Sequence, residues 1–270
     1  PQEDHGGHEG SAAGQGIPVA LHHLGGVQLG AAGSGNPSDP GTGKPAANEI
    51  YYTSRNSKVV APNNPDVFGA VIISNTYADG MGVIIFDKAV TSIGSEAFAY
   101  CDNLINVVIP EGVTSIDYHA FYGCDGLTNI VIPEGVTSIG QAAFKESDNL
   151  ASVVIPEGVT SIGSEAFWDC YNLISVRLPE SLTSLGSIAF SGCENLVSVN
   201  IPQNIKSLNN YTFRGCANLK AITLPEGLTS IGINAFDGCN SLTSIVIPDN
   251  VTSIRDEAFK ECISLESVVI

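Results

Sequence analysis

A repeat solenoid is the fold class that the sequence predicts, and three observations support it. A phenylalanine recurs every 23 residues, without insertion or deletion, from Phe98 to Phe259. Serine precedes each of these phenylalanines by six residues and leucine follows by six, so whole units repeat. Within a unit the apolar spacing switches along its length, which neither one long helix nor one long strand allows. A single unit cannot bury its apolar side alone, whereas stacked copies share a continuous core.

The first part of the chain differs in composition from the rest. Residues 1–48 contain 12 Gly and 5 Pro with few core-forming residues, which predicts a low-complexity leader or linker. Its histidines and nearby acids could hold a transition metal, although incidental, solvated histidines are the simpler interpretation. These histidines are His5, His8, His22 and His23.

Residues 49–82 are expected to form an N-terminal β-cap. Short runs of aromatic and β-branched residues alternate there with turns rich in Asn, Pro and Gly. Solenoids need such a cap because their first coil would otherwise be open. Shifting the repeat back by 23 residues places Ile84 on the position of Val107 and Phe86 on that of Ile109. Residues 83–90 are therefore expected to be a degenerate first coil.

Each coil is expected to contain a strand, a turn, a short helical piece and a return. In one unit, Leu104, Val107 and Ile109 have the spacing of a short strand, and Pro110 ends it because proline has no N–H for a ladder. Residues 118–121 are expected to form a helical or 3₁₀ turn that places Phe121 inside. The strands should form one continuous parallel sheet, and the repeated serines should bond backbone groups of the turns.

The solenoid is expected to cover residues 83–270, as a degenerate first coil and eight 23-residue units. Ile270 occupies the last strand position of its unit. The C-terminal cap is therefore expected to be missing, either because further chain has been removed or because another molecule protects the last coil.

A family resemblance is carried by these same residues. The pattern L-x-x-L-x-L-P followed by V-x-x-I-G-x-x-A-F-x-x-C resembles the BspA-like leucine-rich repeats of bacterial surface proteins, over about residues 83–270. The resemblance implies a right-handed leucine-rich-repeat coil, with a parallel β-sheet on its concave face and short helical or 3₁₀ turns on its convex face. It also implies a secreted or surface-displayed bacterial protein, of a kind often implicated in adhesion.

Two side-chain columns are expected to build the core. The phenylalanine ladder comprises Phe98, Phe121, Phe144, Phe167, Phe190, Phe213, Phe236 and Phe259. Three residues after these lie all seven cysteines: Cys101, Cys124, Cys170, Cys193, Cys216, Cys239 and Cys262. Stacked equivalents should lie about 5 Å apart with parallel side chains, which does not suit a disulfide. Buried free thiols are therefore expected. Metal or nucleophilic roles are not, because the array has one histidine, His119, and no C-x-x-C.

Charge and composition exclude some partners. The chain has 11 Lys and Arg against 28 Asp and Glu, a net charge of −17, which argues against nucleic acid and anionic membranes. No stretch approaches the roughly 20 apolar residues of a membrane helix. Residues 91–270 carry 20 acids against 7 bases, so the acidity lies mainly on the solenoid and favours neutral or basic protein partners.

The candidate site is the outward-facing position of the strands on the concave face. A row of valines there, interrupted in the middle by polar residues, is either a partner-binding surface or a consequence of strand propensity. The candidate partner-binding residues are Val108, Val131, Val154, Arg177, Asn200, Thr223 and Val246. The aromatic residues Tyr100, Tyr122, Trp168, Tyr171 and Tyr211 are expected on the convex or flanking edges, as binding hot spots, as sugar platforms or as partly packed side chains.

The regular scaffold and the absence of a catalytic constellation predict a non-enzymatic interaction module that binds a protein partner. The family resemblance implies that the module is extracellular and that its partner is a host or microbial surface or matrix protein. No cofactor or metal site is expected, because the common catalytic motifs are absent from the sequence. Two alternatives stay open. The array could be a structural spacer that displays another domain, or it could be a carbohydrate-binding module.

Overall fold

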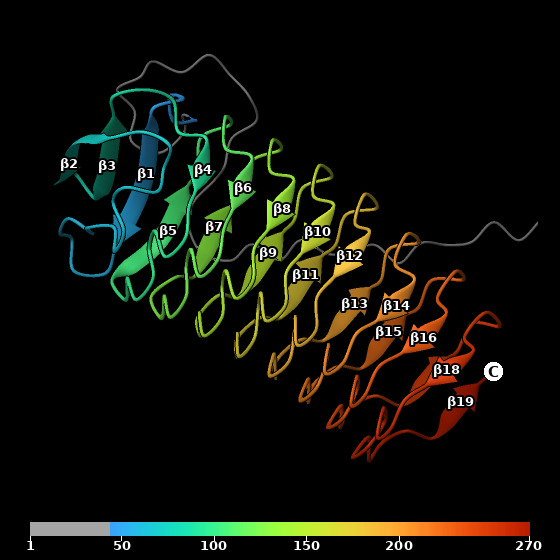
Figure 1. Cartoon of the computed structure of the whole chain (residues 1–270). Coiled ribbons are helices and arrows are strands. Elements are labelled where there is room, and N and C mark those ends of the chain that lie inside the picture. Colours follow the sequence, from blue (N-terminus) through green and yellow to red (C-terminus); the bar gives the residue numbers. More distant parts are fainter. Residues whose placement is uncertain (1–43) are drawn as a thin grey trace, which may run out of the picture. The chain divides into compact units, whose positions relative to one another are not determined.

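The computed structural model describes residues 44–270, which form a β-solenoid of about eight coils (Figure 1). The predicted fold class is therefore confirmed. The leader prediction for residues 1–43, with its histidines, lies outside the described residues. Residues 44–48, which the leader prediction also includes, make backbone hydrogen bonds to residues 86 and 90. The N–H of Phe86 donates to the carbonyl of Asn48 (2.9 Å), and that of Val90 donates to Ala47 (2.8 Å).

The N-terminal segment contributes three antiparallel strands: β1 (Glu49–Ser54), β2 (Ile72–Ala78) and β3 (Met81–Phe86). In the sheet order β2-β3-β1-β5-β7, β1 lies between β3 and the first coil strand, and Tyr51 pairs with Val108. The strand of the expected degenerate first coil is β3, which is not adjacent to β5 in this sheet. β3 runs in the same direction as β5, as expected when the repeat is shifted back by 23 residues. β1, however, is inserted between them and makes the hydrogen bonds that a stacked coil would have made.

The strand row is formed by one short strand from each coil. Its members are β5 (Leu104–Val108), β7 (Asn129–Val131), β9 (Ser152–Val154), β11 (Ser175–Arg177), β13 (Ser198–Asn200), β15 (Ala221–Thr223), β17 (Ser244–Val246) and β19 (Ser267–Val269). The pairing is parallel, but it is interrupted between β7 and β9 and between β15 and β17. The expected single continuous sheet is therefore divided, because strands of three residues share so few bonds that a small change in spacing breaks the ladder.

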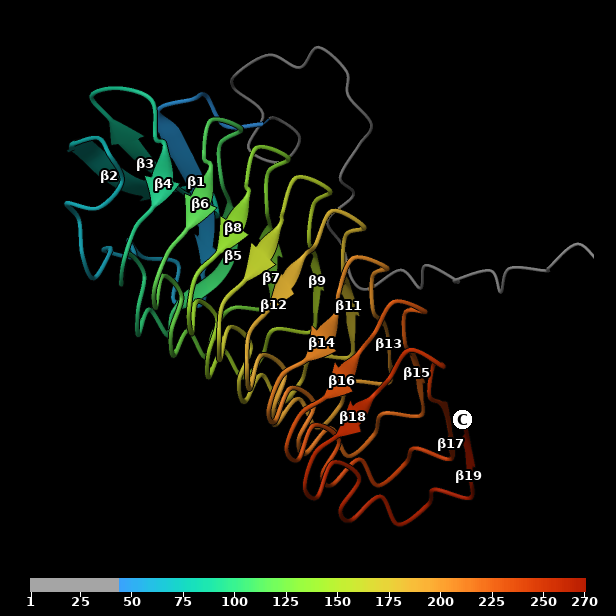
Figure 2. The same ribbon diagram turned by 45° about the vertical axis from the view of Figure 1, so that its right-hand side comes forward.

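A second, shorter row of parallel strands was not predicted. Its members are β4 (Ser92–Ile93), β6 (Ser115–Ile116), β8 (Ser138–Ile139), β10 (Ser161–Ile162), β12 (Ser184–Leu185), β14 (Ser207–Leu208), β16 (Ser230–Ile231) and β18 (Ser253–Ile254). Figure 2 shows this short row stepping along the array beside the strand row. Backbone bonds between coils therefore run along this short row as well as along the strand row, with a break between β12 and β14.

The hydroxyls that bond backbone groups come mainly from a different column than expected. Among the described residues, only Ser92 of the serine ladder bonds a backbone carbonyl through its side chain, that of Val67. The preceding threonines do so instead, each reaching the equivalent residue of the coil before. Thr137 donates to the carbonyl of Thr114 (3.2 Å), and Thr160 donates to that of Thr137 (3.3 Å). The serines lie in the short strands themselves.

The expected helical or 3₁₀ turn is absent, since no helix occurs between residues 44 and 270. Each coil instead has two residues with left-handed backbone, two before and two after the ladder phenylalanine, such as His119 (φ 55°) and Gly123 (φ 62°). Right-handed and left-handed backbone conformations alternate along this turn, and every second N–H therefore points toward the next coil. The N–H of Phe121, for example, donates to the carbonyl of Ala143 (2.7 Å). Left-handed residues interrupt a helix, which explains the difference.

Inside the coils, the phenylalanines form a continuous stack. The rings of Phe121 and Phe144 have centroids 5.3 Å apart and planes inclined by 1°, the offset arrangement that aromatic rings favour over a face-to-face sandwich. At the N-terminal end Phe68 closes the stack with its ring at 67° to that of Phe98. The ladder predicted from the repeat is thus a packed column of the core.

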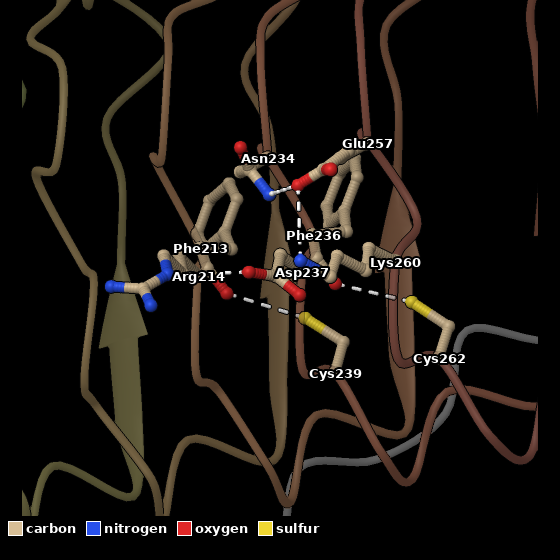
Figure 3. Close-up of polar contacts among 9 residues, drawn as sticks. All are labelled: Phe213, Arg214, Asn234, Phe236, Asp237, Cys239, Glu257, Lys260 and Cys262. Atoms are coloured by element: carbon tan, nitrogen blue, oxygen red, sulfur yellow. Dashed lines mark hydrogen bonds and ion pairs between the residues drawn. The ribbon is translucent and has the colours of Figure 1, made fainter.

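The cysteine column is hydrogen-bonded to the phenylalanine column. All seven cysteines are free thiols, and all but Cys262 are buried. The Sγ of Cys239 lies 3.2 Å from the carbonyl oxygen of Phe213 in the preceding coil (Figure 3). Where serine replaces cysteine, the Oγ of Ser147 donates in the same way to Phe121 (2.8 Å). The shared feature of the column is therefore a small buried donor.

Candidate functional site

The strand row places its predicted residues on one outward surface. Burial alternates along each strand, so that Val153 is buried while Val154 is 63% exposed. Val246 is exposed to the same extent, and Arg177, Asn200 and Thr223 lie exposed between these valines. Val108 and Val131 are only half-buried. The strand row is therefore most accessible from β9 onward.

The cap covers the first part of this surface. β1 pairs with β5, and Asn106 Nδ2 donates to Thr53 Oγ1 at 2.9 Å. Val108 consequently lies beside Tyr51 and presents less of its side chain than the later valines. Farther along, Arg177 Nη2 lies 3.7 Å from Glu157 Oε1, and both side chains are more than half exposed. Such a pair contributes little to stability, so Arg177 is available to a partner.

A groove beside the strand row was missed by sequence reasoning. It has a volume of about 470 Å³ and is lined by Ala151, Asn172, Ile174, Asn195, Val197, Asn218 and Lys220. The asparagines form a ladder in which Asn218 Nδ2 donates to Asn195 Oδ1 (3.1 Å). Ile174 and Val197 are exposed. The groove therefore adds apolar surface next to the strand row. The one feature of the sequence that indicates it is the asparagine found five residues after the ladder phenylalanine in successive units.

Burial raises the pKa of the thiols. Burial raises the pKa of the Cys101 thiol to about 11 and raises the pKa of Cys170 and Cys193 well above the ordinary value. Thiolate is the form that attacks electrophiles and binds metals, and burial disfavours that form for these three thiols. Residues 44–270 hold no cluster of three or more metal-ligating side chains. A membrane-crossing helix was also not found in that part of the chain.

Aromatic and charged side chains gather on another side of the coils, here called the turn face. It comprises the residues from two before to two after each ladder phenylalanine. Tyr100 and Tyr122 pack edge to face at 4.9 Å, and Lys145 Nζ lies 3.8 Å from the ring centre of Trp168. Of the predicted aromatics, Tyr100, Tyr122, Trp168 and Tyr211 lie on this face, whereas Tyr171 lies beyond it and precedes Asn172 of the groove.

The family model for the BspA type leucine rich repeat region matches residues 76–197 and 160–270 and includes six copies. The chain belongs to this family. BspA-type members are generally non-enzymatic repeat scaffolds.

Solved bacterial structures are similar to this chain. A leucine-rich repeat protein from Bacteroides ovatus is 33% identical over 72% of this chain and 55% of its own, with a TM-score of 0.60. The T. pallidum leucine rich repeat protein is 33% identical over 67% of this chain and 80% of its own, with a TM-score of 0.56. A leucine rich cell surface protein from Faecalibacterium prausnitzii is 34% identical over 67% and 57%, with a TM-score of 0.48.

The chain thus spans about half the length of the Bacteroides ovatus protein that it matches. No protein of curated function matches it.

Proposed function

We propose that this protein is an interaction module outside the bacterial cell that binds a protein partner through its strand row. The observation that carries the proposal is the row of exposed side chains from β9 to β17, with apolar Val154 and Val246 at its ends and polar residues between them. The backbone groups of the strands are largely used within the sheets, so a partner must be recognised through these side chains.

The groove beside the row supports the same function. Ile174 and Val197 extend the apolar area, and Lys220 adds a positive charge at its edge. Exposed apolar patches with polar rims are typical of protein-interaction sites. The acidic surface of the solenoid favours a neutral or basic partner. Extracellular location is proposed from the family resemblance to bacterial surface proteins.

A binding screen tests the proposal. The chain would be presented to immobilised matrix proteins and to whole bacterial and host cells. Any partner would then be measured against a variant carrying Val131→Asp, Val154→Asp and Arg177→Asp. Three carboxylates on the row place uncompensated charge in the interface, so affinity should fall at least tenfold, which corresponds to about 1.4 kcal/mol.

The matched control makes the same kind of substitution, an exposed apolar residue to aspartate, outside the strand row. Ile73, on β2 of the cap, is exposed like Val154, and Ile73→Asp should leave the affinity unchanged. Thermal unfolding of each variant would show that the coils remain folded. Equal affinity of the wild-type and the triple variant would contradict the assignment of the strand row.

A further inference from the structure

A hollow on the turn face arises from one small residue in a column of large ones. The position directly after the ladder phenylalanine holds Trp168, Ser191 and Arg214 in three successive coils. Because serine is much shorter than its neighbours, the column is notched at Ser191, whose own side chain is buried at the base. The hollow has a volume of about 430 Å³.

Two aromatic side chains line this hollow. Trp168 comes from the coil before Ser191, and Tyr211 comes from the coil after it. Lys145 Nζ, from the preceding coil, lies over one face of the indole ring at 3.8 Å from its centre, and Trp168 lines the hollow that opens toward the following coils. A cation that packs on one face of an indole ring fixes the ring in place, and the other face can then stack against the apolar face of a ligand ring.

The polar side of the hollow contains an amide and a carboxyl group on two buried residues. Asn234 is 7% exposed and Asp237 is 9% exposed. Asn234 Nδ2 donates to Glu257 Oε2 (3.2 Å), and Asp237 Oδ2 accepts from Arg214 Nε (3.3 Å). The Oδ1 atom of each accepts no hydrogen bond from the described residues. Since these residues leave no fully buried side-chain polar atom without a partner, both Oδ1 atoms are reached by solvent, and both residues line the hollow.

Donors lie beside these acceptors. In Figure 3 the terminal nitrogens of Arg214 point away from Asp237, toward the preceding coils. The Arg214 side chain is fixed by its Nε bond and is 58% exposed, so its remaining N–H groups are available to a ligand. Lys260 bonds Glu257 at 3.2 Å and thereby holds the group that orients Asn234.

We propose that this hollow binds a neutral sugar residue of a glycan. A pyranose ring has an apolar face, which suits Trp168, and hydroxyls that both donate and accept, which suits Arg214 beside the free oxygens of Asn234 and Asp237. The charges of the site are balanced, because Arg214 pairs with Asp237 and Lys260 with Glu257. An anionic ligand would meet two carboxylates, and the open, shallow hollow lacks the enclosed apolar centre of a protein hot spot.

The experiment is a glycan array, followed by calorimetric titration with the glycan that gives the strongest signal. Trp168→Ala removes the platform, and Ser191→Arg fills the notch with a side chain that this column already accepts at Arg214. Each should weaken binding at least tenfold. The matched control is Ser198→Arg, which places the same side chain on the exposed strand row and should leave glycan affinity unchanged.

The two proposals can fail independently. Ser191→Arg should retain any protein partner found on the strand row, while the triple aspartate variant should retain the glycan. An array without signal would overturn the sugar site, as would a glycan affinity that Ser191→Arg does not change. A third outcome would also overturn the sugar site: if no glycan binds and Ser191→Arg loses a protein partner, the hollow recognises a protein.

Discussion

Inward-facing and outward-facing positions of the same coils differ in how far their residues vary. The ladder position is phenylalanine in all eight units, and its rings stack from Phe98 to Phe259. The very next position holds aromatic, basic, acidic and small residues in turn, among them Trp168, Ser191 and Asp237. Internal regularity therefore marks the side chains that must match their neighbours, and variation marks the surfaces that are free to recognise other molecules.

The largest expected effect comes from breaking the inner column in its middle. Phe190 is fully buried between Phe167 (5.2 Å) and Phe213 (5.7 Å). Phe190→Ala removes both stacked contacts and leaves a cavity, so the free energy of unfolding should fall by about 3–5 kcal/mol. Chemical denaturation followed by circular dichroism measures it.

An outward position provides the control for this substitution. Val154→Ala on the strand row should change the unfolding free energy by less than about 0.5 kcal/mol, because Val154 is exposed. If Phe190→Ala and Val154→Ala cost the same, the distinction between inner and outer columns would be wrong.

A smaller effect is expected in the cysteine column, where the donor matters more than the sulfur. Cys193 donates to the carbonyl of Phe167 (3.2 Å), as Ser147 does to Phe121. Cys193→Ser keeps that donor and should be nearly neutral, whereas Cys193→Val removes it and should cost about 1 kcal/mol or more. Thermal unfolding of the two variants compares them. A valine variant as stable as the serine variant would show that only the size of the side chain counts.

The sequence was sufficient to predict the solenoid, the stacked phenylalanines and the outward side of the strand row, because each depends on a pattern that recurs in every unit. The insertion of β1 between β3 and β5 could not be predicted, since it rests on antiparallel pairing of Tyr51 with Val108, far away in the chain. The short row could not be predicted either, because strands of two residues show no periodicity.

The two hollows of the surface could be predicted only in part. Each is lined by residues from several coils, so its shape depends on which side chains happen to be neighbours across the stack. The groove at Asn195 and the notch at Ser191 are both visible in the sequence only once the coils are aligned in register. The left-handed turns are harder to predict from the sequence than the two hollows. Only some coils have glycine at these positions, as at Gly192, while others have large side chains.

The smallest expected effect tests these left-handed turns at an outer position. Ile188 has a φ of 64°, which is unfavourable for a β-branched residue, and the equivalent Asn234 two coils later has a φ of 50°. Asparagine tolerates this conformation, so Ile188→Asn should raise the unfolding free energy by about 0.5–1 kcal/mol. The reverse change, Asn234→Ile, should lower it in the same denaturation experiment. If Ile188→Asn is instead destabilising, the apolar contacts of Ile188 outweigh its backbone strain, and this outer position is constrained by packing like the inner ones.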